Sequence, residues 1–200
     1  MNKIAFAVLM TASAIAATPA SAQQVTGTVN VTGTVAGRCS VIESNLEKTS
    51  FTGTIDLGRL DAADGTLRSE LTSATSANPA DAKKVTARVV CTSSNPTIGV
   101  SATKLAIAGA GDAGTGYANS IDYVAALRVK TASATTPLTE VKFDTQNNSA
   151  AVTAQLGARI AGGTGDNVEV NVSNLRTASG SVLNQGAYAS VISLSITPTL

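Results

Sequence analysis

Apolar residues in this chain recur at every second position far more often than at the three-to-four-residue spacing of a helix. A strand places successive side chains on opposite faces, so this period predicts strands with one buried face. Threonine, serine, valine, alanine and glycine dominate the composition. The clearest candidate strands lie at residues 25–35, 54–60, 85–90, 97–102, 124–130, 152–160, 168–172 and 190–197. Short strands of this kind, separated by turn-rich segments, predict an all-β fold of the antiparallel β-sandwich type.

The segments between these strands are rich in turn-forming residues. Residues 109–116, 162–167 and 178–186 are dominated by glycine and small polar residues. Residues 61–84 are long and polar, and we expect a loop with a helical turn there. We also expect the chain to break at residues 144–149, where Asp144 and two asparagines favour a turn.

The first residues predict an export signal. Lys3 is followed by an apolar run, and Ala20-Ser21-Ala22 matches the pattern of a signal-peptidase site. We therefore expect a signal peptide over residues 1–22 and a mature chain that begins at Gln23. The apolar run is too short to cross the ~30 Å core of a bilayer, and no later stretch approaches the ~20 apolar residues of a spanning helix. Direct membrane insertion of the mature chain is not expected.

The charge balance argues against nucleic acid as a partner. The full chain has 14 Lys plus Arg and 13 Asp plus Glu, and removal of Lys3 with the signal leaves 13 of each. A neutral chain has no electrostatic attraction for a phosphate backbone or an anionic membrane surface. The chain also has no Trp and few other aromatic residues on which bases could stack.

The chain contains two cysteines, Cys39 and Cys91. In an exported protein a disulfide between them is the default interpretation, and free thiols or half of a metal site are the alternatives. Because the chain has no His, a zinc site would need carboxylate ligands. We expect no metal site and no cofactor.

Motifs that carry catalytic chemistry are weak. Residues 109–114 match GxGxxG, but no convincing helix follows, as a dinucleotide site requires. Residues 162–167 resemble a single, imperfect calcium-binding repeat, and a hairpin turn explains them equally well. Neither a GxSxG motif nor a His base accompanies the many serines. We therefore do not expect an enzyme. The alternative that stays open is an extracellular hydrolase that uses a pair of carboxylates. The candidates for such a pair are the four loop carboxylates Asp56, Asp61, Asp64 and Glu70.

Several segments in combination resemble the chaperone-usher pilins. They are VNVTGTV (29–35) ahead of Cys39-Ser40-Val41, TIDLG (54–58), and VTARVVC (85–91), which ends at Cys91. The tail GAYASVISLSIT (186–197) is especially similar to the final strand of the spore coat protein U-like branch. The penultimate tyrosine of classical pilins is missing, and Pro198 removes a backbone donor that a chaperone would use.

The resemblance implies an immunoglobulin-like, pilin-type β-sandwich that lacks its last strand and is completed by a donor strand. Residues 23–35 would be the N-terminal donor-strand extension and residues 36–200 the pilin-like domain. The donor-strand interface would consist of Val25, Val29, Val31, Gly33 and Val35, with the threonines and Asn30 on the opposite face. The implied partners are other copies or related subunits, a periplasmic chaperone and an outer-membrane usher.

The expected function is therefore a structural subunit of a fimbria-like or pilus-like fibre, exported through a periplasm to the cell surface. The alternative is a self-complete secreted β-sandwich that acts as a binding or matrix protein, in which residues 25–35 pair within their own chain. Periodicity by itself favours the two equally, because both need one apolar face.

Overall fold

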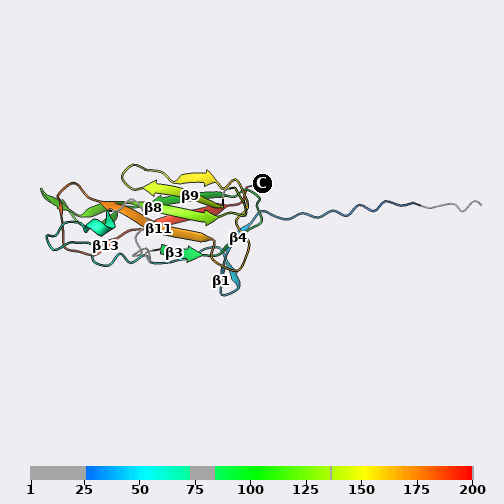
Figure 1. The fold of residues 1–200 in the computed structure, drawn as a ribbon, viewed down its shortest axis with the longest axis horizontal. Coiled ribbons are helices and arrows are strands. Elements are labelled where there is room, and N and C mark those ends of the chain that lie inside the picture. The colour runs from blue at the N-terminus through cyan, green and yellow to red at the C-terminus, as the bar shows by residue number, and fades with distance from the viewer. Residues whose placement is uncertain (1–25, 73–83, 136, 200) are drawn as a thin grey trace, which may run out of the picture. The chain divides into compact units, whose positions relative to one another are not determined.

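The computed structural model describes residues 26–72, 84–135 and 137–199 (Figure 1). The chain divides into two units, residues 1–34 and 35–200, and each is described by itself. In the first unit, residues 26–34 are exposed and form neither strand nor helix. The predicted export signal at 1–22 and the predicted donor residue Val25 lie outside the described residues.

The second unit is all-β, with a single short 3₁₀ turn among its described residues. Its elements are β1 (Cys39–Glu43), β2 (Leu46–Lys48), η1 (Ser69–Leu71), β3 (Lys84–Ala87), β4 (Val89–Cys91), β5 (Thr97–Ala102), β6 (Leu105–Ile107), β7 (Tyr117–Ala118), β8 (Ser120–Lys130), β9 (Leu138–Asp144), β10 (Val152–Gln155), β11 (Val168–Arg176), β12 (Val182–Leu183), β13 (Tyr188–Ala189) and β14 (Ile192–Thr197).

Two antiparallel sheets pack on one core in a β-sandwich-like arrangement. The larger sheet has the order β13-β6-β8-β11-β3, with β9 paired to β8, and Figure 1 shows β9, β8 and β11 side by side. The second sheet has the order β10-β5-β14. Alternate residues of β8 from Ile121 to Val129 are buried, as are Ile98 and Val100 of β5. The period of two seen in the sequence therefore marks the face that each strand turns to the core.

A smaller antiparallel sheet, β2-β1-β4, lies at the end of the unit that contains the cysteines. Cys39 of β1 is directly opposite Cys91 of β4 in the register, and the two form a disulfide. The predicted disulfide is confirmed. At the other end of β8, the short strands β7 and β12 pair in parallel and tie the loops of that end together.

Most predicted strands exist, but their limits differ. The strand expected at 85–90 is split at Arg88, so that β3 joins the large sheet and β4 joins the cysteine sheet. The strand expected at 152–160 ends at Gln155, because Gly157 takes a positive φ of 70° that leaves the extended conformation. No strand forms at 54–60. Residues 26–35, within the predicted strand at 25–35, form no strand either.

Other expectations about the connections are met. The chain turns after Asp144, as predicted, and η1 is a helical turn within the long polar loop, whose residues 73–83 lie outside the described part. Residues 109–116 form a loop that leads into the strand β7 and not into a helix. β9 is not among the predicted strands, although its buried Val141 and Phe143 alternate with exposed residues, and neither are the short strands β1, β2 and β6.

Candidate functional site

β14 is an edge strand with an apolar face. Its side chains alternate, with Ile192, Leu194 and Ile196 half-buried and the intervening Ser193, Ser195 and Thr197 exposed. All six residues pair antiparallel with β5. Within the described residues no strand pairs with the other edge of β14. Its backbone groups on that side are therefore available to another strand.

An extended segment lies across from β14. In residues 51–57 the side chains of Phe51, Ile55 and Leu57 are half-buried against the core, while those between them are exposed. No backbone–backbone hydrogen bond joins residues 49–55 to the rest of the described chain. The segment has the side-chain alternation of a strand without the hydrogen bonds of one.

Gly53 allows this segment to approach β3 closely. A Cβ atom at this position would lie 2.5 Å from Cγ1 of Val85, closer than two carbon atoms can pack. The contact holds the segment against β3 by side-chain packing. Among the described residues, no backbone–backbone hydrogen bond joins residues 49–55 to β3 or to β14.

A groove runs between β14 and residues 49–57. It consists of two adjoining cavities of about 480 Å³ and 330 Å³, which share Phe51, Ile192 and Leu194 as walls. The larger cavity extends toward Tyr188 and has a floor of Leu105, Tyr123, Val170 and Val172. The smaller one extends toward the disulfide and has a floor of Val41, Val89, Leu127 and Val168. We call the two cavities together the acceptor groove.

The acceptor groove carries no charge. None of its lining residues is Asp, Glu, Lys or Arg. Its tyrosines stay neutral, because burial raises the pKa of both Tyr123 and Tyr188 above the ordinary value of 10.0. The Tyr123 hydroxyl is hydrogen-bonded to Ser190, which lowers that pKa only in part. A neutral apolar floor between two unpaired backbone edges suits an uncharged extended segment with an apolar residue at every second position.

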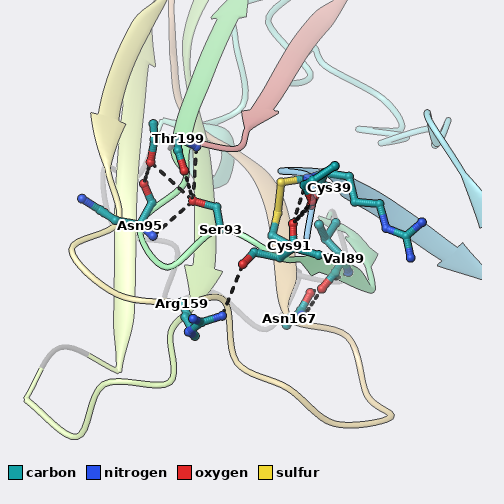
Figure 2. The surroundings of a disulfide bond; sticks show 11 residues. Cys39, Val89, Cys91, Ser93, Asn95, Arg159, Asn167 and Thr199 are labelled. Atoms are coloured by element: carbon teal, nitrogen blue, oxygen red, sulfur yellow. Dashed lines mark hydrogen bonds between the residues drawn. A yellow bond between two sulfur atoms is a disulfide. The ribbon is translucent and has the colours of Figure 1, made fainter. Parts of the chain in front are cut away.

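Figure 2 shows the surroundings of the disulfide between Cys39 and Cys91, both residues of the end of the domain toward which the smaller cavity extends. Asn167 is buried there and accepts a hydrogen bond from the Val89 N–H at 2.8 Å. Its amide nitrogen donates to the carbonyls of Val89 at 2.7 Å and Ala161 at 2.9 Å. This side chain anchors β4, and with it Cys91, to the start of β11. Sequence reasoning interpreted residues 162–167 only as a turn and missed this role.

The predicted donor-strand residues remain a prediction. The side chains of Val29, Val31 and Val35 are 86%, 91% and 84% exposed. A Cβ atom at Gly33 would have no neighbour within 4 Å.

The four loop carboxylates of the hydrolase alternative are held by their own neighbours. Asp61 is bonded to Arg59 at 2.9 Å, Asp64 to Thr66, and Glu70 to Arg68. Asp56 accepts the N–H of Gly58 at 2.7 Å. The side-chain hydrogen bond from Arg59 lowers the pKa of Asp61, and the one from Thr66 lowers the pKa of Asp64. The pKa of Glu70 is lowered by a hydrogen bond from its own backbone and by one from the Arg68 side chain. The pKa of a general acid would instead be raised, so Asp61, Asp64 and Glu70 lack that feature.

Comparison with known proteins gives no relative: no protein-family model, no curated protein and no solved structure matches the chain. Among the described residues, no group of three or more potential metal ligands comes together. No helix in this part of the chain is long and apolar enough to cross a membrane.

Proposed function

We propose that this chain is a structural subunit of a fimbria-like surface fibre, assembled by donor-strand exchange. In this scheme the acceptor groove of one copy receives residues 25–35 of another, and the domain is a pilin-type sandwich that the incoming strand completes. The observation that carries the proposal is the match between groove and segment. The groove is neutral, apolar and flanked by two unpaired edges, and residues 25–35 are uncharged and alternate between apolar and polar side chains.

The position of the chain's exit from the domain favours a second copy as donor. Gly37 lies beside Pro198, because a Cβ atom added to Gly37 would be 3.5 Å from the Cβ atom of Pro198. The chain therefore leaves the domain at the end where β14 finishes. A segment folding straight back from there into its own groove would run parallel to β14. Antiparallel pairing is the more stable arrangement, and a strand from another copy reaches it without a reversing loop.

The energy of such a contact is sufficient for a stable fibre. Burial of Val29, Val31 and Val35 contributes about 5 to 9 kcal/mol, at ~1.5–3 kcal/mol for each side chain. Backbone hydrogen bonds on both edges add about 1 kcal/mol each. Each subunit offers its extension at one place and its groove at another, so these head-to-tail contacts do not close on themselves and propagate as a filament.

The remaining elements of the proposal concern export. An open apolar groove is an aggregation hazard in the periplasm, which is the reason that a chaperone and an outer-membrane usher would accompany the subunit. The alternative, a self-complete secreted binding or matrix module, requires residues 25–35 to serve as a strand of their own sandwich. The described residues 26–35 form no such strand.

The test is an unboiled and a boiled gel of material sheared from cells that express the protein. We expect a ladder of heat-labile multimers that collapses to one band on boiling. Gly33→Leu should abolish the ladder and leave export intact, because the added side chain enters a groove with no room for it. Thr32→Leu adds the same side chain to the opposite, solvent-facing side and is the matched control, which should form a normal ladder. A normal ladder from Gly33→Leu contradicts the proposal.

A further inference from the structure

The turn that follows Cys91 holds the point where the N-terminal segment joins the domain. The Thr92 hydroxyl accepts the N–H of Arg38 at 2.8 Å and donates to the carbonyl of Ala36 at 3.0 Å. The N–H of Thr92 also donates to the carbonyl of Arg38 at 2.9 Å. With the neighbouring disulfide, these bonds fasten residues 36–39 to the turn.

The same turn holds the residues that follow β14. The Ser93 hydroxyl, which is buried, donates to the carbonyl of Thr199 at 2.8 Å and accepts the Thr199 N–H at 3.2 Å. The hydroxyl of Thr199 in turn donates to the carbonyl of Asn95. Figure 2 shows Ser93, Asn95 and Thr199 converging beside the disulfide.

We infer that residues 92–95 are a clamp that keeps the free edge of β14 in place for the incoming strand, with Ser93 and Thr199 as its positioning residues. This inference rests on the proposed function, because it assigns a role to the edge that the donor strand uses. β14 is short and paired on one side only, so its far end would fray if nothing held it. The clamp supplies that restraint where the ladder with β5 stops, at Thr197.

The consequence of the clamp is preorganisation. A groove whose edge strand is already ordered does not have to order it on binding, so it captures its ligand faster and more tightly. The clamp should affect capture more than release, because a bound donor strand pairs with β14 and holds it from the other side. A residue that only stabilised the fold would not produce this difference between the two rates.

The experiment uses the purified full chain and a fluorescent peptide with the sequence of residues 25–35. Ser93→Ala and Thr199→Val remove the clamp's hydroxyl groups, and Thr199→Ser keeps the hydroxyl as the conservative variant. Thr145→Val is the matched control, because it removes two hydrogen bonds, one to the Asp122 carboxylate and one from the Tyr123 N–H, that involve neither β14 nor residues 92–95. Amide hydrogen exchange of β14 in the unassembled chain is measured beside the association and dissociation rates of the peptide.

We expect Ser93→Ala and Thr199→Val to speed exchange of the β14 amides by on the order of tenfold, the effect of one or two lost hydrogen bonds. Peptide association should slow severalfold with unchanged dissociation, and Thr199→Ser and Thr145→Val should behave as the unaltered chain does in both measurements. The inference is overturned if the β14 amides of both clamp variants exchange at the rate of the unaltered chain. It is also overturned if Thr145→Val slows peptide association as much as the clamp variants do. If the unaltered chain captures no peptide, the proposed function fails, and the exchange data still decide whether the clamp orders β14.

Discussion

Asn167 should be the polar side chain on which the disulfide end of the domain most depends. It is 6% exposed and makes three hydrogen bonds to backbone groups of Val89 and Ala161. Asn167→Ala leaves these three groups without a partner inside the protein. Each lost bond costs ~1 kcal/mol, and more where the backbone group stays buried, so the expected loss of unfolding free energy is about 3 to 6 kcal/mol. That is a large part of the ~5–15 kcal/mol that stabilises a typical domain.

The assay is urea denaturation followed by circular dichroism, with Gln185→Ala as an exposed control that should lie within ~0.5 kcal/mol of the unaltered chain. A loss below about 1 kcal/mol for Asn167→Ala would refute the reasoning, since it would mean that water or a rearranged backbone satisfies the freed groups.

The isosteric Asn167→Asp change tests the same contacts by pH. One carboxylate oxygen can accept the Val89 N–H, but the other would face the carbonyls of Val89 and Ala161. Ionisation is therefore disfavoured in the folded state, and the pKa of this carboxyl should be raised there above its unfolded value of about 3.9. The folded state then binds more protons than the unfolded state, so the variant should be most destabilised at neutral pH and recover as the pH falls toward 4. A pH-independent difference from the unaltered chain would contradict this account.

Two further predictions concern the disulfide and one partly buried ion pair, Asp144 with Arg176. Replacing Cys39 and Cys91 together by alanine frees a constraint between residues 52 positions apart, which the chain-entropy model values at about 4 kcal/mol; an unchanged urea midpoint would contradict it. At Asp144, burial opposes ionisation, but the Gln146 N–H, Arg176 and other donors together lower its pKa below 3.8. The ionised carboxylate contributes its full stabilisation above the ordinary pKa of 3.8, and this stabilisation is lost as the pH falls through the lowered pKa of the folded state. The difference in unfolding free energy between the unaltered chain and Asp144→Asn should therefore shrink below about pH 4. A difference that grows on acidification would show the sign to be wrong.

The parts of the groove differ in how far the sequence predicted them. The alternation of Ile192, Leu194 and Ile196 marks β14 and its apolar face without any structure, because side-chain direction in a strand follows position alone. The opposite wall, residues 49–57, overlaps the strand that the pattern predicts at 54–60, and no strand forms there. Phe51, Ile55 and Leu57 do alternate, but a strand also needs a hydrogen-bonding partner on a neighbouring segment, and alternation by itself cannot supply one.

The sequence by itself determined the all-β class, the strands whose faces differ most in polarity, and the two cysteines that form the disulfide. These follow from local rules, namely the period of two and the pairing expected of two cysteines in a chain with a predicted export signal. Only the tertiary structure decided that β14 is an edge strand, that Gly53 brings the opposite wall against Val85, and that Ser93 meets Thr199 across 106 positions of sequence. Such contacts depend on which strands become neighbours, and that order is set by packing of the whole core, which a pattern along the chain does not contain.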